Sequence, residues 1–115
     1  MTVSAYAAAL AEKIAAELPD DATATADPRA ATPPCVLIQH IAATRAMCGL
    51  TVEWEVVALA PGPFNLDAWE ALDALAPAVL AATDAEGYRV VAYRLALDNP
   101  PLPAYLFTFT GGVDL

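Results

Sequence analysis

The residues that could do metal chemistry are few in this chain. It has one histidine, His40, and two cysteines, Cys35 and Cys48. The three could in principle hold a metal ion, but their spacing matches no recognised ligand pattern, and a fourth ligand would have to come from elsewhere. No zinc-protease motif, phosphate-binding loop, serine-hydrolase elbow or CxxC pair occurs. We therefore predict a histidine on a strand and two packed thiols, with neither a metal nor another cofactor.

Two sets of carboxylates are spaced regularly enough to suggest chemistry. Asp67, Glu70 and Asp73 recur at every third residue and could mimic a catalytic acid pair. The same spacing is that of one solvated face of a helix, which we favour. Glu53 and Glu55 share one face of a predicted strand and could bind a cation. We favour instead a face that meets water or lines a channel, and we predict that the protein is not an enzyme.

Aromatic residues and one arginine are the candidates for contacts. Tyr105, Phe107 and Phe109 alternate along the last predicted strand, so they form one aromatic face. That face could be core, or it could belong to a sheet edge to which a neighbouring chain adds. Arg45 is the lone charge in an apolar connection, and it is either a surface arginine or half of an intersubunit salt bridge.

Composition limits the classes of protein to which the chain can belong. Its 115 residues suit one domain, residues 1–115, and its 58% hydrophobic content argues against disorder. A net charge of −9 opposes attraction to nucleic acid and to anionic membranes. No apolar run is long enough to span a membrane, and the first residues lack the basic start of a signal peptide. Two cysteines are too few for a disulfide scaffold, so we expect reduced thiols and an intracellular origin.

Periodicity and turn residues predict six elements in the order α-β-β-α-β-β. Trp54 and Trp69 lie on apolar stripes, and both should be core residues, where strand and helix meet. The predicted elements are a helix at 3–18, a loop at 19–34, strands at 35–41 and 49–60 joined by a connection at 42–48, a helix capped by Asn65 that Pro77 should kink or restart, a strand at 88–97, and a strand at 104–110 followed by a free tail.

The predicted strand at 49–60 changes character along its length. Apolar and polar side chains alternate as far as Glu55, after which Val57 and Leu59 make the second face apolar as well. The first part of this strand should therefore have one solvent-exposed face, and the last part should be buried on both faces beneath other parts of the chain. Short turns between strands favour antiparallel pairs, so we predict an α+β fold with an antiparallel or mixed sheet of about four strands packed against two helices.

Several segments together resemble the tail terminators of siphophages that infect actinobacteria. Besides the alanine-rich first helix, they are Asp27-Pro28-Arg29, the run at 33–38, Ala60-Pro61-Gly62-Pro63, Asn65-Leu66-Asp67-Ala68, and Leu102-Pro103-Ala104-Tyr105. The resemblance spans nearly the whole chain, and its motifs are proline turns and helix caps.

The resemblance implies a structural virion protein at the head-proximal end of the phage tail, made in the host cytoplasm. Such proteins are similar in fold to a small α+β domain that forms a hexameric ring. The ring ends polymerisation of the tube made by the major tail tube protein and offers a surface to the head–tail connector or stopper. DNA passes through its lumen without specific binding. Glu53 and Glu55, or the acidic helix face, would line that lumen, because an acidic ring would let DNA slide.

Other classes of protein remain as alternatives. The nearest is another head-to-tail connector, either a stopper or a tail-completion protein, which composition cannot separate from a terminator. A small enzyme or ligand-binding domain would need a pocket with convergent polar groups. A chaperone-like or toxin-neutralising acidic protein would remain a monomer or dimer and never enter a particle.

Overall fold

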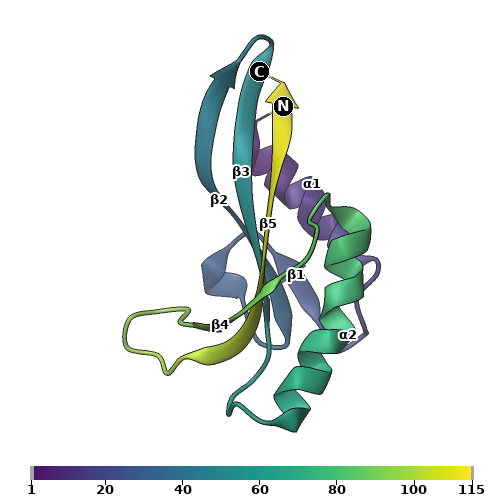
Figure 1. The fold of residues 1–115 in the computed structure, drawn as a ribbon, viewed down its shortest axis with the longest axis vertical. Helices are drawn as coiled ribbons and strands as arrows, with labels where there is room; N and C mark the ends of the chain where they lie inside the picture. The colour runs from purple at the N-terminus through teal and green to yellow at the C-terminus, as the bar shows by residue number, and fades with distance from the viewer. Residues whose placement is uncertain (1, 115) are drawn as a thin grey trace.

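Two helices pack against one face of a five-stranded sheet in the computed structural model, which describes residues 2–114 (Figure 1). The predicted α+β class is confirmed. The elements are helix α1 (Val3–Ala15), strand β1 (Thr23–Thr25), the 3₁₀ helix η1 (Pro28–Ala30), strands β2 (Cys35–Ala46) and β3 (Gly49–Leu59), helix α2 (Leu66–Ala82), and strands β4 (Arg89–Tyr93) and β5 (Leu102–Asp114).

The sheet is mixed and its three central strands are much longer than its two outer ones. The order is β1-β2-β3-β5-β4, with β1 parallel to β2 and every other pair antiparallel. β5 pairs with the whole of β3, whereas β4 covers only residues 102–106 of β5 and β1 covers only residues 35–37 of β2. The far halves of β2, β3 and β5 therefore form a three-stranded extension.

Local sequence explains where the two helices begin and how they pack. The Thr2 hydroxyl accepts a hydrogen bond from the Ala5 N–H at 3.1 Å, and the Asn65 Oδ1 accepts one from the Ala68 N–H at 3.0 Å. α2 continues through Pro77 as one helix, contrary to a restart there. The Pro77 ring is exposed, while Val79 in the following turn is buried, so packing holds the helix together across the missing hydrogen bond.

Removing the cap of α2 should weaken the fold measurably. We expect Asn65→Ala to lower the free energy of unfolding by about 1 kcal/mol, because the Ala68 N–H loses its acceptor. Asn65→Asp is the control, since aspartate caps as well as asparagine and should leave stability within a few tenths of a kcal/mol. Urea unfolding of the three proteins measures both changes, and equal losses in the two variants would contradict a capping role.

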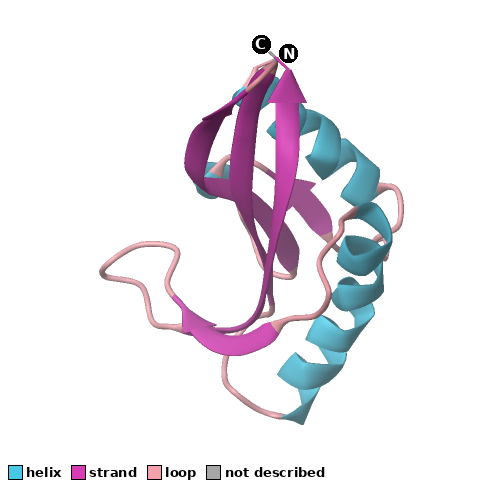
Figure 2. Cartoon of the chain, turned by 45° about the horizontal axis from the view of Figure 1, so that its top comes forward, coloured by secondary structure: helices cyan, strands magenta, loops and turns pink. Residues whose placement is uncertain are grey.

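The main core lies between the helices and the sheet. Trp54, Val56 and Phe107 are fully buried there against Ile14 of α1 and Leu72 of α2. Figure 2 shows both helices on this one side of the sheet. No helix among residues 2–114 has the length and apolar character required to cross a membrane.

A second, smaller core lies on the opposite face. Val57 and Leu59 are buried there with Cys35, Leu37 and Ala104. The predicted burial of the second face of this strand is thus confirmed. The cover consists of Ala31 and of apolar residues from the β4–β5 hairpin, which curls over this face: Val91, Tyr93, Leu95, Leu102 and Leu106. The hydrogen bond from Gln39 Nε2 to the Tyr93 hydroxyl, 2.7 Å long, marks the limit of this cover.

The predicted connection at 42–48 is wrong, because β2 continues to Ala46 and the turn is only Met47 and Cys48. Residues 42–46 are mostly alanine, a poor strand former, so their sequence reads as a loop. Pairing with β3 overrides that weak preference. The register shifts between His40 and Ala42, which makes Ile41 a β-bulge.

The predicted free tail after residue 110 is also wrong. Gly111 and Gly112 lie within β5 and pair with Val52 and Thr51 of β3. A Cβ at Gly111 would lie 3.4 Å from Trp54 Nε1, so the glycine permits close packing of the strand on that ring. The strand predicted at 88–97 shortens to Arg89–Tyr93.

The predicted loop at 19–34 contains β1 and η1. Asp27 caps η1 because its Oδ1 accepts from the Arg29 N–H at 3.0 Å, and this bond holds the pKa of the Asp27 carboxyl below its usual value. Asp27-Pro28-Arg29 is therefore a local capping motif.

Candidate functional site

The predicted acidic strand face exists and points away from both helices. Glu53 lies between Ala42 of β2 and Thr110 of β5 in the register of the sheet. Glu55, two residues along, lies between Gln39 and Thr108. Both carboxylates share this face because successive side chains of a strand alternate, and Glu53 is exposed while Glu55 is half-buried.

The strand positions that flank the two glutamates are uncharged and mostly small. The residues that flank them on the same face of the extension are Gln39, Ala42, Thr44, Thr51, Thr108, Thr110 and Gly112. Neither Glu53 nor Glu55 forms an ion pair within residues 2–114. We call this surface, residues 42, 44, 51, 53, 55, 108, 110 and 112, the acidic face. It presents two negative charges among threonine, alanine and glycine residues.

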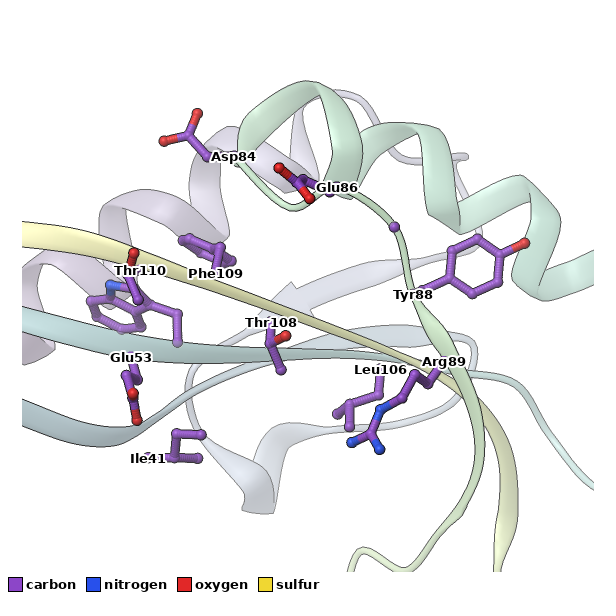
Figure 3. Close-up of a pocket in the computed structure, with 12 residues that line it drawn as sticks. Ile41, Glu53, Asp84, Glu86, Tyr88, Arg89, Leu106, Thr108, Phe109 and Thr110 are labelled. Atoms are coloured by element: carbon purple, nitrogen blue, oxygen red, sulfur yellow. The ribbon is translucent and has the colours of Figure 1, made fainter.

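An open hollow of about 740 Å³ lies beside β5 where β4 stops covering it (Figure 3). Thr108 and Phe109 of β5 form its floor. Asp84 and Glu86, from the segment after α2, lie on the helix side of β5, and Glu53 lies on the other side. Three carboxylates and one cation, Arg89 of β4, thus line the hollow. The hollow follows the uncovered edge of β5.

The aromatic residues predicted as interface candidates are mainly core. Phe107 is fully buried, Tyr105 is nearly so, and Phe109 is half-buried with its ring stacked on Trp54 at a centroid distance of 6.4 Å. All three point toward the helices, because that face of β5 lies under α1 and α2. The core alternative therefore holds for Tyr105 and Phe107, and a contact on this strand would use its backbone edge.

Tyr105 has a structural role that its sequence position did not reveal. Its hydroxyl donates to the Asp73 Oδ1 at 2.7 Å, and its ring stacks on Tyr88 at 4.0 Å. Burial, reinforced by the hydrogen bond to Asp73, raises the pKa of Tyr105 well above its usual value. Asp73 is exposed on α2, as Asp67 and Glu70 are, but it also accepts the hydrogen bond from Tyr105.

Arg45 is exposed near the far end of β2, opposite Leu50 and on the helix side of the sheet. It forms no ion pair within the described part of the chain. Glu53 and Glu55 lie on the opposite face, so the structure does not bring the predicted interface arginine and the predicted lumen residues together.

The three residues that could hold a metal are separated. Cys35 begins β2 and is buried in the second core, whereas Cys48 follows the end of the same strand and is exposed. At about 3.3 Å per residue the strand keeps them roughly 40 Å apart. His40 lies between them with its ring edge toward Trp54. These positions do not support one ion held by all three.

The two thiols should therefore react very differently. Burial raises the pKa of the Cys35 thiol to about 11, although a hydrogen bond from the Thr32 backbone opposes the shift. We expect a thiol-specific disulfide reagent at pH 8 to label one cysteine of the native protein rapidly and the second only after unfolding in urea. Cys48→Ser should abolish the rapid reaction. Rapid labelling of two thiols in the native protein would contradict the burial of Cys35.

Two features of this site had no clear signal in the sequence. The hollow exists because β4 pairs with only part of β5. The periodicity of the local sequence does not show how far two strands pair. Asp84 and Glu86 read as ordinary turn residues, and only the fold places them beside β5. Comparison of the chain with models of protein families, with curated proteins and with solved structures gives no match in any of the three.

Proposed function

We propose that the protein is a structural subunit of a phage virion that forms a ring, of six copies, at the head-proximal end of the tail tube. The ring ends tube polymerisation, joins the tail to the head connector and lets DNA pass through its centre. The resemblance in sequence to tail terminators suggests this role, and the acidic face is the structural observation that supports it.

The acidic face suits the wall of a passage for DNA. Glu53 and Glu55 project from a three-stranded extension whose other side chains on that face are uncharged and mostly small. Repeated around an axis, these carboxylates would repel the phosphate backbone, and no cation of the extension would hold it on this face. The helices occupy the opposite side of the sheet and would form the outer wall (Figure 2).

The test is the addition of the purified protein to growing tail tubes, with tube length and end structure read by negative-stain electron microscopy. We expect shorter tubes, each with a ring at one end, and rings of six in the free protein by mass measurement. An unrelated acidic protein of similar size is the control. Rings that leave tube growth unchanged would remove the terminator role and favour another head-to-tail connector.

A further inference from the structure

Two strand edges of the extension lack a partner within residues 2–114. Beyond the short contact with β1, residues 39–46 of β2 pair only with β3. Beyond the contact with β4, residues 107–114 of β5 likewise pair only with β3. In Figure 1 no further strand lies beside β2 or β5 in this part of the sheet. Each edge presents backbone N–H and C=O groups at alternate residues.

The edge of β5 has none of the features that usually prevent strand addition. Residues 107–113 contain no proline, lysine or arginine, and their pairing with β3 shows no register shift. Soluble proteins normally protect a long edge with such residues or with a bulge. The hollow beside Thr108 and Phe109 leaves room along this edge, because the segment at 84–88 stands away from it (Figure 3). Such an edge is suited to receive another strand.

The charges near the two edges are compatible with their pairing. Asp84 and Glu86 lie on the helix side of the β5 edge (Figure 3). The free half of β2 contains no acidic residue in a chain of net charge −9, and it carries Arg45 and His40 on the same helix side of the sheet. A β2 edge from another copy would therefore place His40, and no further carboxylate, beside the carboxylates that line the hollow.

Strand direction also permits this pairing to repeat. β2 and β5 are both antiparallel to β3, so they run parallel to each other. In a ring with cyclic symmetry every copy has the same orientation to the axis, so β5 of one copy meets β2 of the next in parallel. Each copy offers one edge of each kind, which is the requirement for a head-to-tail contact that closes.

We propose that residues 107–114 of β5 pair in parallel with residues 39–46 of β2 in a second copy of this chain, and that repetition of this contact closes the sheets into a ring. The bulkier helix layer then lies outside and the acidic face lies inside. The inference rests on the proposed function only for cyclic closure, and it specifies which surfaces of the ring subunits meet.

Disulfide cross-linking tests the contact directly. In a Cys48→Ser background, Thr110→Cys on β5 is combined in turn with Ala42→Cys, Thr44→Cys or Ala46→Cys on β2, which scans the unknown register on one face of the sheet. Within one chain these positions are separated by β3, so the strands are about 10 Å apart, too far for an internal disulfide. Oxidation should give a ladder of covalent multimers on a non-reducing gel, ending at the closed ring.

The controls separate this contact from others. Thr110→Cys alone should remain monomeric on the gel, as should Thr110→Cys with Glu70→Cys on the exposed face of α2. Dimers from Thr110→Cys alone would indicate β5 pairing with β5 and would overturn the proposal, as would the absence of a ladder from every pair. A ladder without tube capping would support the contact and remove the terminator role. Rings without a ladder would keep that role and overturn the contact.

Discussion

Replacing Glu53 and Glu55 together by lysine is expected to turn a protein that leaves duplex DNA free into one that retains it. Each exchange adds two units of charge, so the net charge rises only from −9 to −5. The acidic face itself, however, changes from negative to positive. Lysines on adjacent positions of a repeated face would contact phosphates and release counterions, which gives non-specific dissociation constants of about 10⁻⁶–10⁻⁴ M at physiological salt.

The measurement is binding of a labelled DNA duplex at several salt concentrations, with tail assembly and DNA ejection as readouts in particles. Binding should weaken steeply as salt rises, and ejection should slow while assembly proceeds. Asp67→Lys with Glu70→Lys is the matched control, because it makes the same change in net charge on α2, across the sheet from the acidic face.

The control also separates two hypotheses about the lumen. The sequence allowed either the strand glutamates or the acidic helix face to line it, and the fold places them on opposite sides of the sheet. Equal DNA retention by both variants would show that net charge alone matters. DNA retention by the Asp67→Lys, Glu70→Lys variant alone would place α2, and not the acidic face, toward DNA.

Loss of Trp54 is expected to have the largest effect on stability. Its side chain is fully buried, and its ring stacks on Tyr6 at 5.1 Å and on Phe109 at 6.4 Å. Trp54→Ala removes these contacts and leaves a cavity, so the free energy of unfolding should fall by about 3–5 kcal/mol. Trp69→Ala is a matched control, because Trp69 is only half-buried, and it should cost clearly less.

Trp54→Phe should be milder than its loss of volume suggests. The Trp54 Nε1–H is buried and has no hydrogen-bond partner among residues 2–114, and an unmade buried hydrogen bond costs about 1–3 kcal/mol. Phenylalanine removes that unpaired donor while it keeps an aromatic ring against Tyr6 and Phe109. Urea unfolding of the three variants measures the order, and a phenylalanine variant as unstable as the alanine variant would contradict this explanation.

Local signals predicted the parts of the fold that local chemistry determines. Asn65 caps α2 as its residue type and position suggested, and the alternation around Glu53 placed the acidic face correctly. The change to a doubly apolar strand at Val57 predicted the second core. These features depend on near neighbours in the chain, so a single sequence carries them.

The wrong predictions concern segments whose structure depends on pairing with distant parts of the chain. Residues 42–46 and the glycines at 111 and 112 have poor strand propensity, yet they extend the sheet because β3 lies between them and bonds to both. Because residues 42–46 were predicted as a loop and residues 111 and 112 as a tail, the two unpaired strand edges were not predicted either. A strand is at an edge when no other strand pairs with one of its sides. Sequence periodicity shows which side chains share a face but not which strands pair.

The placement of β5 between β3 and β4 has a consequence for folding order. The β2–β3 hairpin closes through Met47 and Cys48 alone, whereas pairing of β3 with β5 must bring Leu59 to Ala104 across all of residues 60–103. By the logarithmic loop-closure relation the longer loop costs about 3 kcal/mol more in chain entropy. The β2–β3 hairpin is therefore expected to form early. The edge of β3 that pairs with β5 stays unpaired until β5, the last strand in the sequence, is in place.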